Sequence, residues 1–436
     1  MLRRLLYLLL CLALGACASA APTGSAPSAT PAAGTATLPV PSHTPTPARP
    51  QITQAAPFPT CQPDPVPPAQ FVPLPSLAAP ITTTQTAALT LRSLADPHGF
   101  HIGAATDPGW LGNQEHASLL ASQFNTLAAE NAMKWEFIHP EPDRYDFTGG
   151  DILVNFARAN NMAVYAHVLA WDLQQPRWLT EGNYSRDEWI QIFCRHIKTV
   201  VGRYRGQVYA WDVVNEPFDD QGQLNNTLWM RKIGPEYIPM AFQWAHEADP
   251  QAVLVLNEAR AEGLNAKSQA VYALAWGLLQ RGVPLHAVGL QMHAGLWGEP
   301  TASDLAANLR RLTALGLQVH ITEMDVRTQY LSEGPGQELQ IQAKMYRQVL
   351  AVCLETPGCT TFITWGLSDQ ESWIPGYTGR PDMPLLFDQQ RQPKPAYQAV
   401  LEELSRLPLP GVTRARPVLP SSTPPAPAPA APGFQP

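Results

Sequence analysis

Several features that mark other protein classes are scarce in this 436-residue chain. Lysine and arginine number 29 against 36 aspartate and glutamate residues, which gives a net charge of −7 at pH 7. No basic run would follow a nucleic-acid backbone, so we expect no nucleic acid as a partner. The chain has only six cysteines, and no Cys/His spacing resembles a zinc site. We therefore expect neither a metal nor another cofactor.

The apolar run near the N-terminus is too short to cross a bilayer. Leu5–Leu14 follows Arg3 and Arg4, as in an export signal. The segment 1–17 ends in Leu-Gly-Ala-Cys, which resembles a bacterial lipobox, so Cys17 would be a lipidated first residue. Such an anchor would tether an exported, extracellular protein to a cell membrane as a lipoprotein. The alternative is an ordinary secretory signal that is cleaved near Ala18 or Ala20.

Proline is concentrated at the two ends of the chain. Residues 18–84 and 407–436 are rich in Pro, Ala, Thr and Ser, and they lack the apolar content of a folded core. We expect a disordered, extended linker and a disordered tail. One folded domain over 85–406 remains, and we expect a monomer.

The cysteines fit an oxidising location. Cys353 and Cys359 flank a five-residue stretch short enough for a local disulfide. Cys61 and Cys194 either pair or stay free, and their spacing does not decide between the two.

Short apolar runs alternate with amphipathic stretches through the folded body. The predicted strands are 100–105, 126–129, 163–169, 208–214, 252–257, 287–291, 318–322 and 361–365. The predicted helices include 151–160, 186–204, 235–248, 266–281, 303–315 and 337–355. This pattern predicts an α/β protein with a single (β/α)8 TIM barrel. An open doubly wound sheet is disfavoured, because no glycine-rich phosphate turn follows the first strand.

Two predicted strands lead into carboxylates. The run 208–214 continues into Asn215-Glu216-Pro217, and the run 318–322 continues into Glu323 with Asp325 two residues later. Two carboxylates at separate strand ends are what glycoside hydrolysis requires. Taken alone, the two runs support two interpretations equally well: a catalytic pair, or unrelated loop carboxylates that form ion pairs.

The other predicted strand ends carry amides, imidazoles and indoles. Sugars offer hydroxyls to polar groups and C–H faces to aromatic rings, so this inventory suits a polysaccharide cleft. The side chains concerned are Glu130, Asn131, Lys134, His167, Trp171, Gln174, Gln291, His293, Trp365 and Trp373.

Four motifs together resemble glycoside hydrolase family 10, which consists mostly of retaining endo-1,4-β-xylanases on a (β/α)8 barrel. They are Glu130-Asn131-Ala132-Met133-Lys134-Trp135, Trp211-Asp212-Val213-Val214-Asn215-Glu216, Ile321-Thr322-Glu323-Met324-Asp325 and Thr364-Trp365-Gly366. The match runs in order from about residue 91 to residue 404.

This resemblance implies roles for the two carboxylates and their neighbours. Glu216 would be the acid/base and Glu323 the nucleophile, with the two carboxyl groups about 5 Å apart. Asn215 would bind the sugar 2-hydroxyl. His293, in the motif Gln291-x-His293, would hold the nucleophile, and Asp325 would orient this histidine.

The resemblance also implies a glycone wall and a roof over the cleft. Asn131, Lys134, His167 and Trp171 match positions that line the glycone side. Trp365 and Trp373 would stack on the sugar or roof the cleft, although burial of Trp373 for packing alone is the alternative.

Three positions depart from the family's pattern. Asp172 stands where the family usually has His, Asn257-Glu258-Ala259-Arg260 replaces Asn-Asp-Tyr-Asn, and Ile374 replaces Arg. These changes affect the walls of the cleft. Arg260 could recognise an acidic substituent such as a glucuronic side group.

We therefore expect a retaining endo-β-1,4-xylanase that degrades xylan. One alternative is another β-1,4-glycanase on the same scaffold, acting on glucan or a mixed polymer. The other is a catalytically silent cell-surface carbohydrate-binding protein, which the presence of both Glu216 and Glu323 disfavours.

Overall fold

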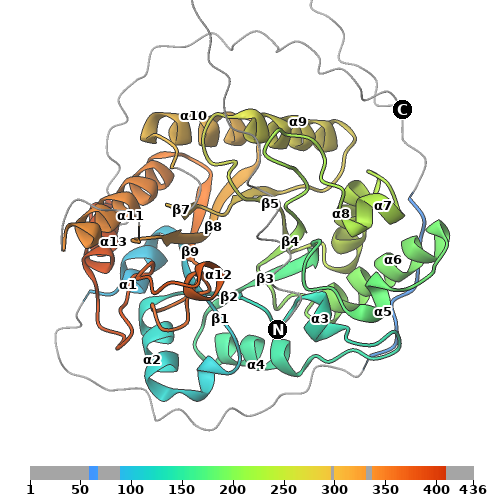
Figure 1. Ribbon diagram of the computed structural model, residues 1–436, viewed down its shortest axis with the longest axis horizontal. Helices are drawn as coiled ribbons and strands as arrows, with labels where there is room; N and C mark the ends of the chain where they lie inside the picture. Colours follow the sequence, from blue (N-terminus) through green and yellow to red (C-terminus); the bar gives the residue numbers. More distant parts are fainter. Residues whose placement is uncertain (1–57, 67–88, 296–298, 330–335, 409–436) are drawn as a thin grey trace, which may run out of the picture. The chain divides into compact units, whose positions relative to one another are not determined.

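The computed structural model describes residues 58–66, 89–295, 299–329 and 336–408, and its barrel is seen end-on in Figure 1. The strands are β1 (His101–Thr106), β2 (Thr126–Ala129), β3 (Ala163–Ala170), β4 (Ala210–Asn215), β5 (Val253–Glu258), β6 (Ala287–Leu290), β7 (His293–Ala294), β8 (Gln318–Val326) and β9 (Cys359–Thr364). All pairings between them are parallel.

The sheet closes on itself. Neighbouring strands follow the order β6-β5-β4-β3-β2-β1-β9-β8, and pairing of β6 with β8 completes the ring. The fold is therefore the predicted (β/α)8 barrel. The two-residue strand β7, which the sequence did not predict, pairs only with the end of β8.

Helices surround the barrel (Figure 1). They are α1 (Leu91–Ala95), α2 (Gln114–Gln123), α3 (Trp135–Ile138), α4 (Thr148–Ala159), α5 (Arg177–Thr180), α6 (Arg186–Arg203), α7 (Leu228–Lys232), α8 (Tyr237–Ala248), α9 (Ala266–Gln280), α10 (Ala302–Thr313), α11 (Gln337–Glu355), α12 (Ile374–Thr378) and α13 (Pro395–Leu404). Capping residues set several starts. Ser185 and Glu188 form a capping box at α6, and Asn265 and Ser268 form one at α9.

The eight predicted strands agree with the observed ones to within two residues, except at one end. Strand β8 runs four residues beyond the predicted 318–322, through Glu323 and Asp325 to Val326. The physical reason is the short strand β7, in which His293 pairs with Asp325 and Ala294 with Val326. The nucleophile candidate therefore lies within a strand and not after it.

Small side chains fill much of the barrel interior. Ala105, Ala128, Ala210 and Ala287 pack there with Tyr165, Val255, Ile363 and Trp365. The larger apolar core lies between the strands and the surrounding helices. The packed interior leaves the strand ends as the place for chemistry.

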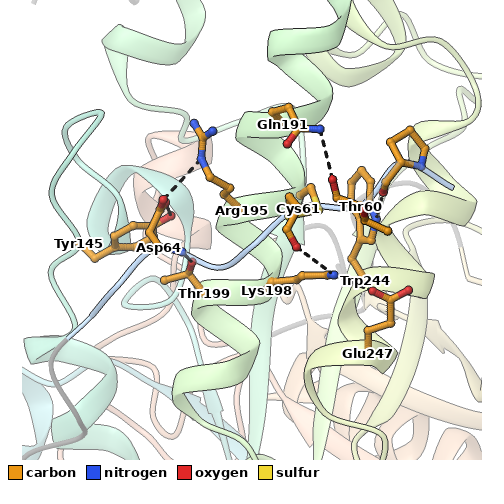
Figure 2. The surroundings of a disulfide bond; sticks show 12 residues. Thr60, Cys61, Asp64, Tyr145, Gln191, Arg195, Lys198, Thr199, Trp244 and Glu247 are labelled. Carbon is orange, nitrogen blue, oxygen red and sulfur yellow. Dashed lines mark hydrogen bonds and ion pairs between the residues drawn. A yellow bond between two sulfur atoms is a disulfide. The ribbon is translucent and has the colours of Figure 1, made fainter.

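A stretch within the predicted linker lies against the barrel. Cys61 forms a disulfide with Cys194 of α6, which settles the pairing that the sequence left open (Figure 2). The backbone oxygen of Pro59 accepts a 2.9 Å hydrogen bond from Trp244 Nε1 of α8, and Asp64 accepts one of 2.9 Å from the Tyr145 hydroxyl. Residues 58–66 are thus fastened to α6 and α8, whereas composition alone predicts a free tether.

Two other sequence predictions concern cysteines. Cys353 and Cys359 form the predicted local disulfide between α11 and β9. Cys17 lies outside the described residues. No helix among the described residues is long and apolar enough to cross a membrane.

Candidate active site

A ring of unusual backbone conformations marks the carboxyl-terminal ends of four neighbouring strands. The left-handed residues are Gln174 (φ 50°), Glu216 (55°), Arg260 (59°) and Met292 (63°), which follow β3, β4, β5 and β6. Non-glycine residues in this region cost on the order of 1–3 kcal/mol each and persist where surrounding contacts hold them. These four residues therefore lie where the active site of such a barrel is expected, at the carboxyl-terminal ends of the strands.

Glu216 follows the last residue of β4, and two side chains hold its carboxylate. Trp171 Nε1 donates to Oε2 at 2.9 Å, and Gln291 Nε2 donates to Oε1 at 2.8 Å. The backbone N–H of Glu216 donates to the carbonyl of Asn257 at 3.0 Å. The carboxyl group is thus fixed in direction while the residue stays partly exposed.

Glu323 lies across the site on β8 and is buried. Its Oε1 accepts a 2.6 Å hydrogen bond from Asn257 Nδ2, and its Oε2 lies 3.2 Å from His293 Nε2. Both carboxylate oxygens are therefore held in place. The bonds leave the carboxylate oriented as a nucleophile requires.

His293 connects Glu323 with a second acid. Its Nδ1 lies 2.9 Å from Asp325 Oδ2, and the same oxygen accepts the indole N–H of Trp373 at 2.9 Å. Burial alone would lower the pKa of His293, but the charges of Asp325 and Glu323 outweigh it and raise the pKa to about 10. His293 is therefore a cation at neutral pH and balances the two carboxylates.

Amide side chains join the two halves of the site. Asn215 Oδ1 accepts from Asn257 Nδ2 at 2.9 Å and from Gln291 Nε2 at 3.2 Å. Asn257 also donates to Glu323, and Gln291 also donates to Glu216. One hydrogen-bonded network thus fixes both carboxylates and Asn215 together.

A second group of predicted residues forms one wall. Lys134 Nζ donates to Asn131 Oδ1 at 3.0 Å and to Gln174 Oε1 at 2.7 Å, and it lies 4.9 Å from the ring centre of Trp171. Burial lowers the pKa of Lys134. Burial, reinforced by Asp107, raises the pKa of Glu130 to about 8.

His167 of β3 is buried beside Trp365, with ring centres 5.2 Å apart. Its Nδ1 is 2.8 Å from Asp212 Oδ2, and Tyr165 donates to Asp212 Oδ1 at 3.0 Å. Ligand-type atoms of His167, Asp212 and Glu323 lie within 4.8 Å of one another, which places the nucleophile candidate next to this pair. Burial lowers the pKa of His167 and raises that of Asp212.

The departures from the family pattern have structural partners. Arg260 forms an ion pair with Asp220, which joins the loops after β5 and β4. Asp172 accepts the backbone N–H of Leu228 at the start of α7, and Ile374 is buried at the start of α12. Arg260 therefore shares its charge with a carboxylate, which weakens the case for recognition of an acidic sugar group.

Three buried residues of the site were given no role from the sequence. Asn257 bridges Asn215 and Glu323, Asp212 holds His167, and Glu262 accepts the backbone N–H of Met292 at 2.9 Å. A sequence signal exists for two of them, since Asp212 and Asn257 are polar residues within apolar strand runs. Glu262 follows the fifth predicted strand, 252–257, but its loop position does not indicate which group it binds.

The sequence of the barrel matches known proteins. Residues 90–403 match the family described as Glycosyl hydrolase family 10. The chain is similar to endo-1,4-beta-xylanase B of Thermotoga neapolitana, with 42% identity over 72% of this chain and 90% of that protein. It is also similar to a beta-1,4-xylanase of Dictyoglomus thermophilum, with 39% identity over 70% of this chain and 88% of that protein.

A solved structure matches the chain in both sequence and fold. Xylanase 10B of Thermotoga petrophila RKU-1, in complex with xylobiose, is 40% identical and covers 74% of this chain and 99% of its own, with a TM-score of 0.70. The match of sequence over the whole barrel, together with that of fold, shows that the chain belongs to glycosyl hydrolase family 10.

Proposed function

We propose that this chain is a retaining endo-1,4-β-xylanase that cleaves internal bonds of xylan through a covalent glycosyl-enzyme intermediate. The observation that carries the proposal is the network of Asn215, Asn257 and Gln291, which links the carboxylates of Glu216 and Glu323 by hydrogen bonds. The names of the xylanases to which the chain is similar support the choice of substrate.

The first step is the attack of Glu323 on the anomeric carbon. A bond forms between a carboxylate oxygen and this carbon as the glycosidic bond breaks, and Glu216 gives its proton to the leaving oxygen. The ester that forms removes the negative charge of Glu323. Glu216 is then an ionised base, which takes a proton from water as the water attacks the anomeric carbon from the face opposite Glu323. The bond from this carbon to the Glu323 oxygen breaks, and Glu323 is released as a carboxylate.

The groups around Glu216 and Glu323 would position these two carboxylates and the bound sugar. His293, held by Asp325, lies against the Glu323 carboxylate and holds it in position for attack. Asn215 would bond the 2-hydroxyl of the sugar at the cleavage point, a contact that strengthens in the transition state. Trp365 and Trp373 offer indole rings to the sugar on the side of β9 and α12.

The wall of Asn131, Lys134, Gln174 and Trp171 would bind the glycone part of the chain, together with Glu130 and His167. The Lys134 ammonium group has three N–H donors for sugar hydroxyls and for the oxygens of Asn131 and Gln174. The Trp171 ring offers a flat apolar face to a sugar ring. This wall would fix the direction in which the polysaccharide lies across the cleft.

The test is release of reducing sugar from purified β-1,4-xylan, with wild type beside Glu323→Ala. Xylo-oligosaccharides from the wild type and loss of at least a thousandfold in the variant are expected, because the variant has no nucleophile. Inactivity of a folded wild type on xylan would contradict the substrate. A panel of β-1,4-glucan and mixed-linkage polymers would then test the alternative glycanase.

Export and anchoring belong to the same proposal. The charged start, the apolar run 5–14 and the Leu-Gly-Ala-Cys ending support lipidation at Cys17, and the two disulfides suit an oxidising compartment. Labelled fatty acid should enter the wild type in a bacterial host but not Cys17→Ser. Label in neither would favour an ordinary secreted protein.

We also propose that the enzyme is a monomer. Its elution volume in size-exclusion chromatography tests this.

A further inference from the structure

The loop after β3 is tied to the start of α7 by two hydrogen bonds. The carboxylate of Asp172 accepts the backbone N–H of Leu228, the first residue of α7. The backbone oxygen of Trp171 accepts the Nε1–H of Trp229 at 3.1 Å, and Trp171 donates its own Nε1–H to Glu216 Oε2 at 2.9 Å. We propose that Asp172 is a positioning residue for the acid/base candidate Glu216 and acts through Trp171. Trp229 shares this role.

Helix α7 is a firm support for these two bonds. The side chain of Trp229 is buried, and its ring stacks on that of Phe193 of α6 with ring centres 4.2 Å apart. The Thr227 side chain accepts the backbone N–H of Met230 at 3.1 Å and caps the start of the helix. A shift of Trp171 away from α7 would therefore break hydrogen bonds to a part of the molecule that close packing holds in place.

The indole ring of Trp171 depends on this support. The ring is only partly buried, so packing alone does not fix its direction. Lys134 Nζ lies 4.9 Å from its ring centre, and the ring of His167 meets it edge-on at 5.9 Å. The indole N–H therefore reaches Glu216 only where the backbone of Trp171 is held. Because a general acid must lie within hydrogen-bond reach of the leaving oxygen, a small displacement of Glu216 slows proton transfer.

Packing does not explain the side chain of Asp172. The residue is exposed, and it replaces the histidine that is usual in the family at this position. Its negative charge suits the start of a helix, so the bond to Leu228 also stabilises α7. Loss of this stabilisation alone would lower the melting temperature without changing proton donation by Glu216. The inference rests on the proposed function, and its test needs a readout that is specific to the acid.

The test compares aryl β-xylobiosides with a poor leaving group, phenyl, and a good one, 2,4-dinitrophenyl. Phenolate leaves slowly unless an acid protonates its oxygen, whereas dinitrophenolate leaves without a proton. The constant kcat/KM covers the steps up to the breaking of the glycosidic bond, so it reports the acid role of Glu216 and not its later base role. Asp172→Ala should lower kcat/KM by roughly tenfold on the phenyl substrate and by about twofold or less on the dinitrophenyl substrate. Glu216→Ala should show the same selectivity with a larger loss.

Three further variants separate positioning from general damage, and thermal melts of each confirm folding. Asp172→Asn keeps the acceptor oxygen and should keep the wild-type ratio of the two constants. Trp229→Phe keeps a ring against Phe193 but lacks the N–H donor, so it should lower kcat/KM on the phenyl substrate by roughly threefold or more. Asp249 is the matched control, since it accepts the backbone N–H of Gly206 at 2.8 Å just before β5, at the opposite end of the barrel. Asp249→Ala should lower the melting temperature and leave the ratio unchanged.

The outcomes distinguish the positioning role from the proposed function. An equal loss on both substrates in Asp172→Ala, or no loss on either, would overturn the positioning role. The same holds if Asp172→Asn behaves like Asp172→Ala, because the acceptor oxygen would then be irrelevant. Hydrolysis of neither xylobioside by the folded wild type would instead contradict the proposed function.

Discussion

The carboxylate of Glu262 accepts the backbone N–H of Met292 at 2.9 Å and so fastens a left-handed turn between Gln291 and His293. The same oxygen accepts the N–H of Arg260, another left-handed residue, at 3.1 Å. Gln291 holds Glu216, and His293 holds Glu323. One buried side chain outside the catalytic pair therefore supports the geometry of both halves of the site.

We expect Glu262→Ala to lower kcat by tenfold or more and to change KM less, because it releases two strained turns that position the catalytic groups. Glu262→Gln keeps a carbonyl oxygen for both N–H donors and should retain most of the activity. Steady-state kinetics of both variants, with thermal melts to confirm folding, provide the measurement. Equal activity of the two variants would show that this oxygen has no positioning role.

The two disulfides should differ in their contribution to stability. The Cys61–Cys194 bond spans a sequence separation of 133 residues, and the Cys353–Cys359 bond one of 6. From loop-closure entropy alone, the first contributes about 5 kcal/mol and the second about 2 kcal/mol. Cys61→Ser should therefore lower the melting temperature more than Cys353→Ser.

Differential scanning calorimetry of the two variants, each with its partner cysteine also changed to Ser, measures this order. Activity at 25 °C should stay near the wild-type value in the Cys61 variant, because the bond joins Cys61 to α6, a helix that carries none of the residues of the candidate site. A larger loss of stability from the short loop would refute the entropic argument.

Stability should fall as the solution becomes alkaline. The pKa of His293 is raised from an ordinary 6.5 to about 10 in the folded protein. The folded state thus keeps a proton that the unfolded chain releases above about pH 6.5, so this contribution is complete below that pH and is lost on the way to pH 10. Asp325→Asn removes one charge that raises this pKa and should flatten the decline.

Denaturant unfolding between pH 6 and pH 10 provides the comparison of wild type with Asp325→Asn. Other titrating groups are shared by the two proteins, so the difference between the curves reports mainly on His293. Parallel curves would mean that Asp325 does not control this titration.

The fold could be predicted from the sequence because its signals are local. Each barrel strand is a short apolar run, and Glu216, Glu323 and His293 follow or continue such runs. The end of β8 could not be predicted, because it depends on pairing with β7, a contact that no local pattern encodes.

The supporting contacts were harder to predict for the same reason. The Cys61–Cys194 bond and the hydrogen bond from the Met292 N–H to Glu262 join segments that come close together only when the barrel closes. Asp212 is the exception, since an acid within the apolar run 208–214 already suggests a buried partner, which is His167.

The proposed mechanism requires a covalent bond between Glu323 and the sugar. A 2-deoxy-2-fluoro xylobioside with a good leaving group should react with the enzyme and accumulate as an ester. The fluorine in place of the 2-hydroxyl slows both steps, and the good leaving group speeds only the first. Peptide mass spectrometry of the inactivated protein should place the added 2-deoxy-2-fluoroxylobiosyl group on Glu323. Attachment to Glu216, or turnover with inversion at the anomeric carbon and no adduct, would contradict the mechanism.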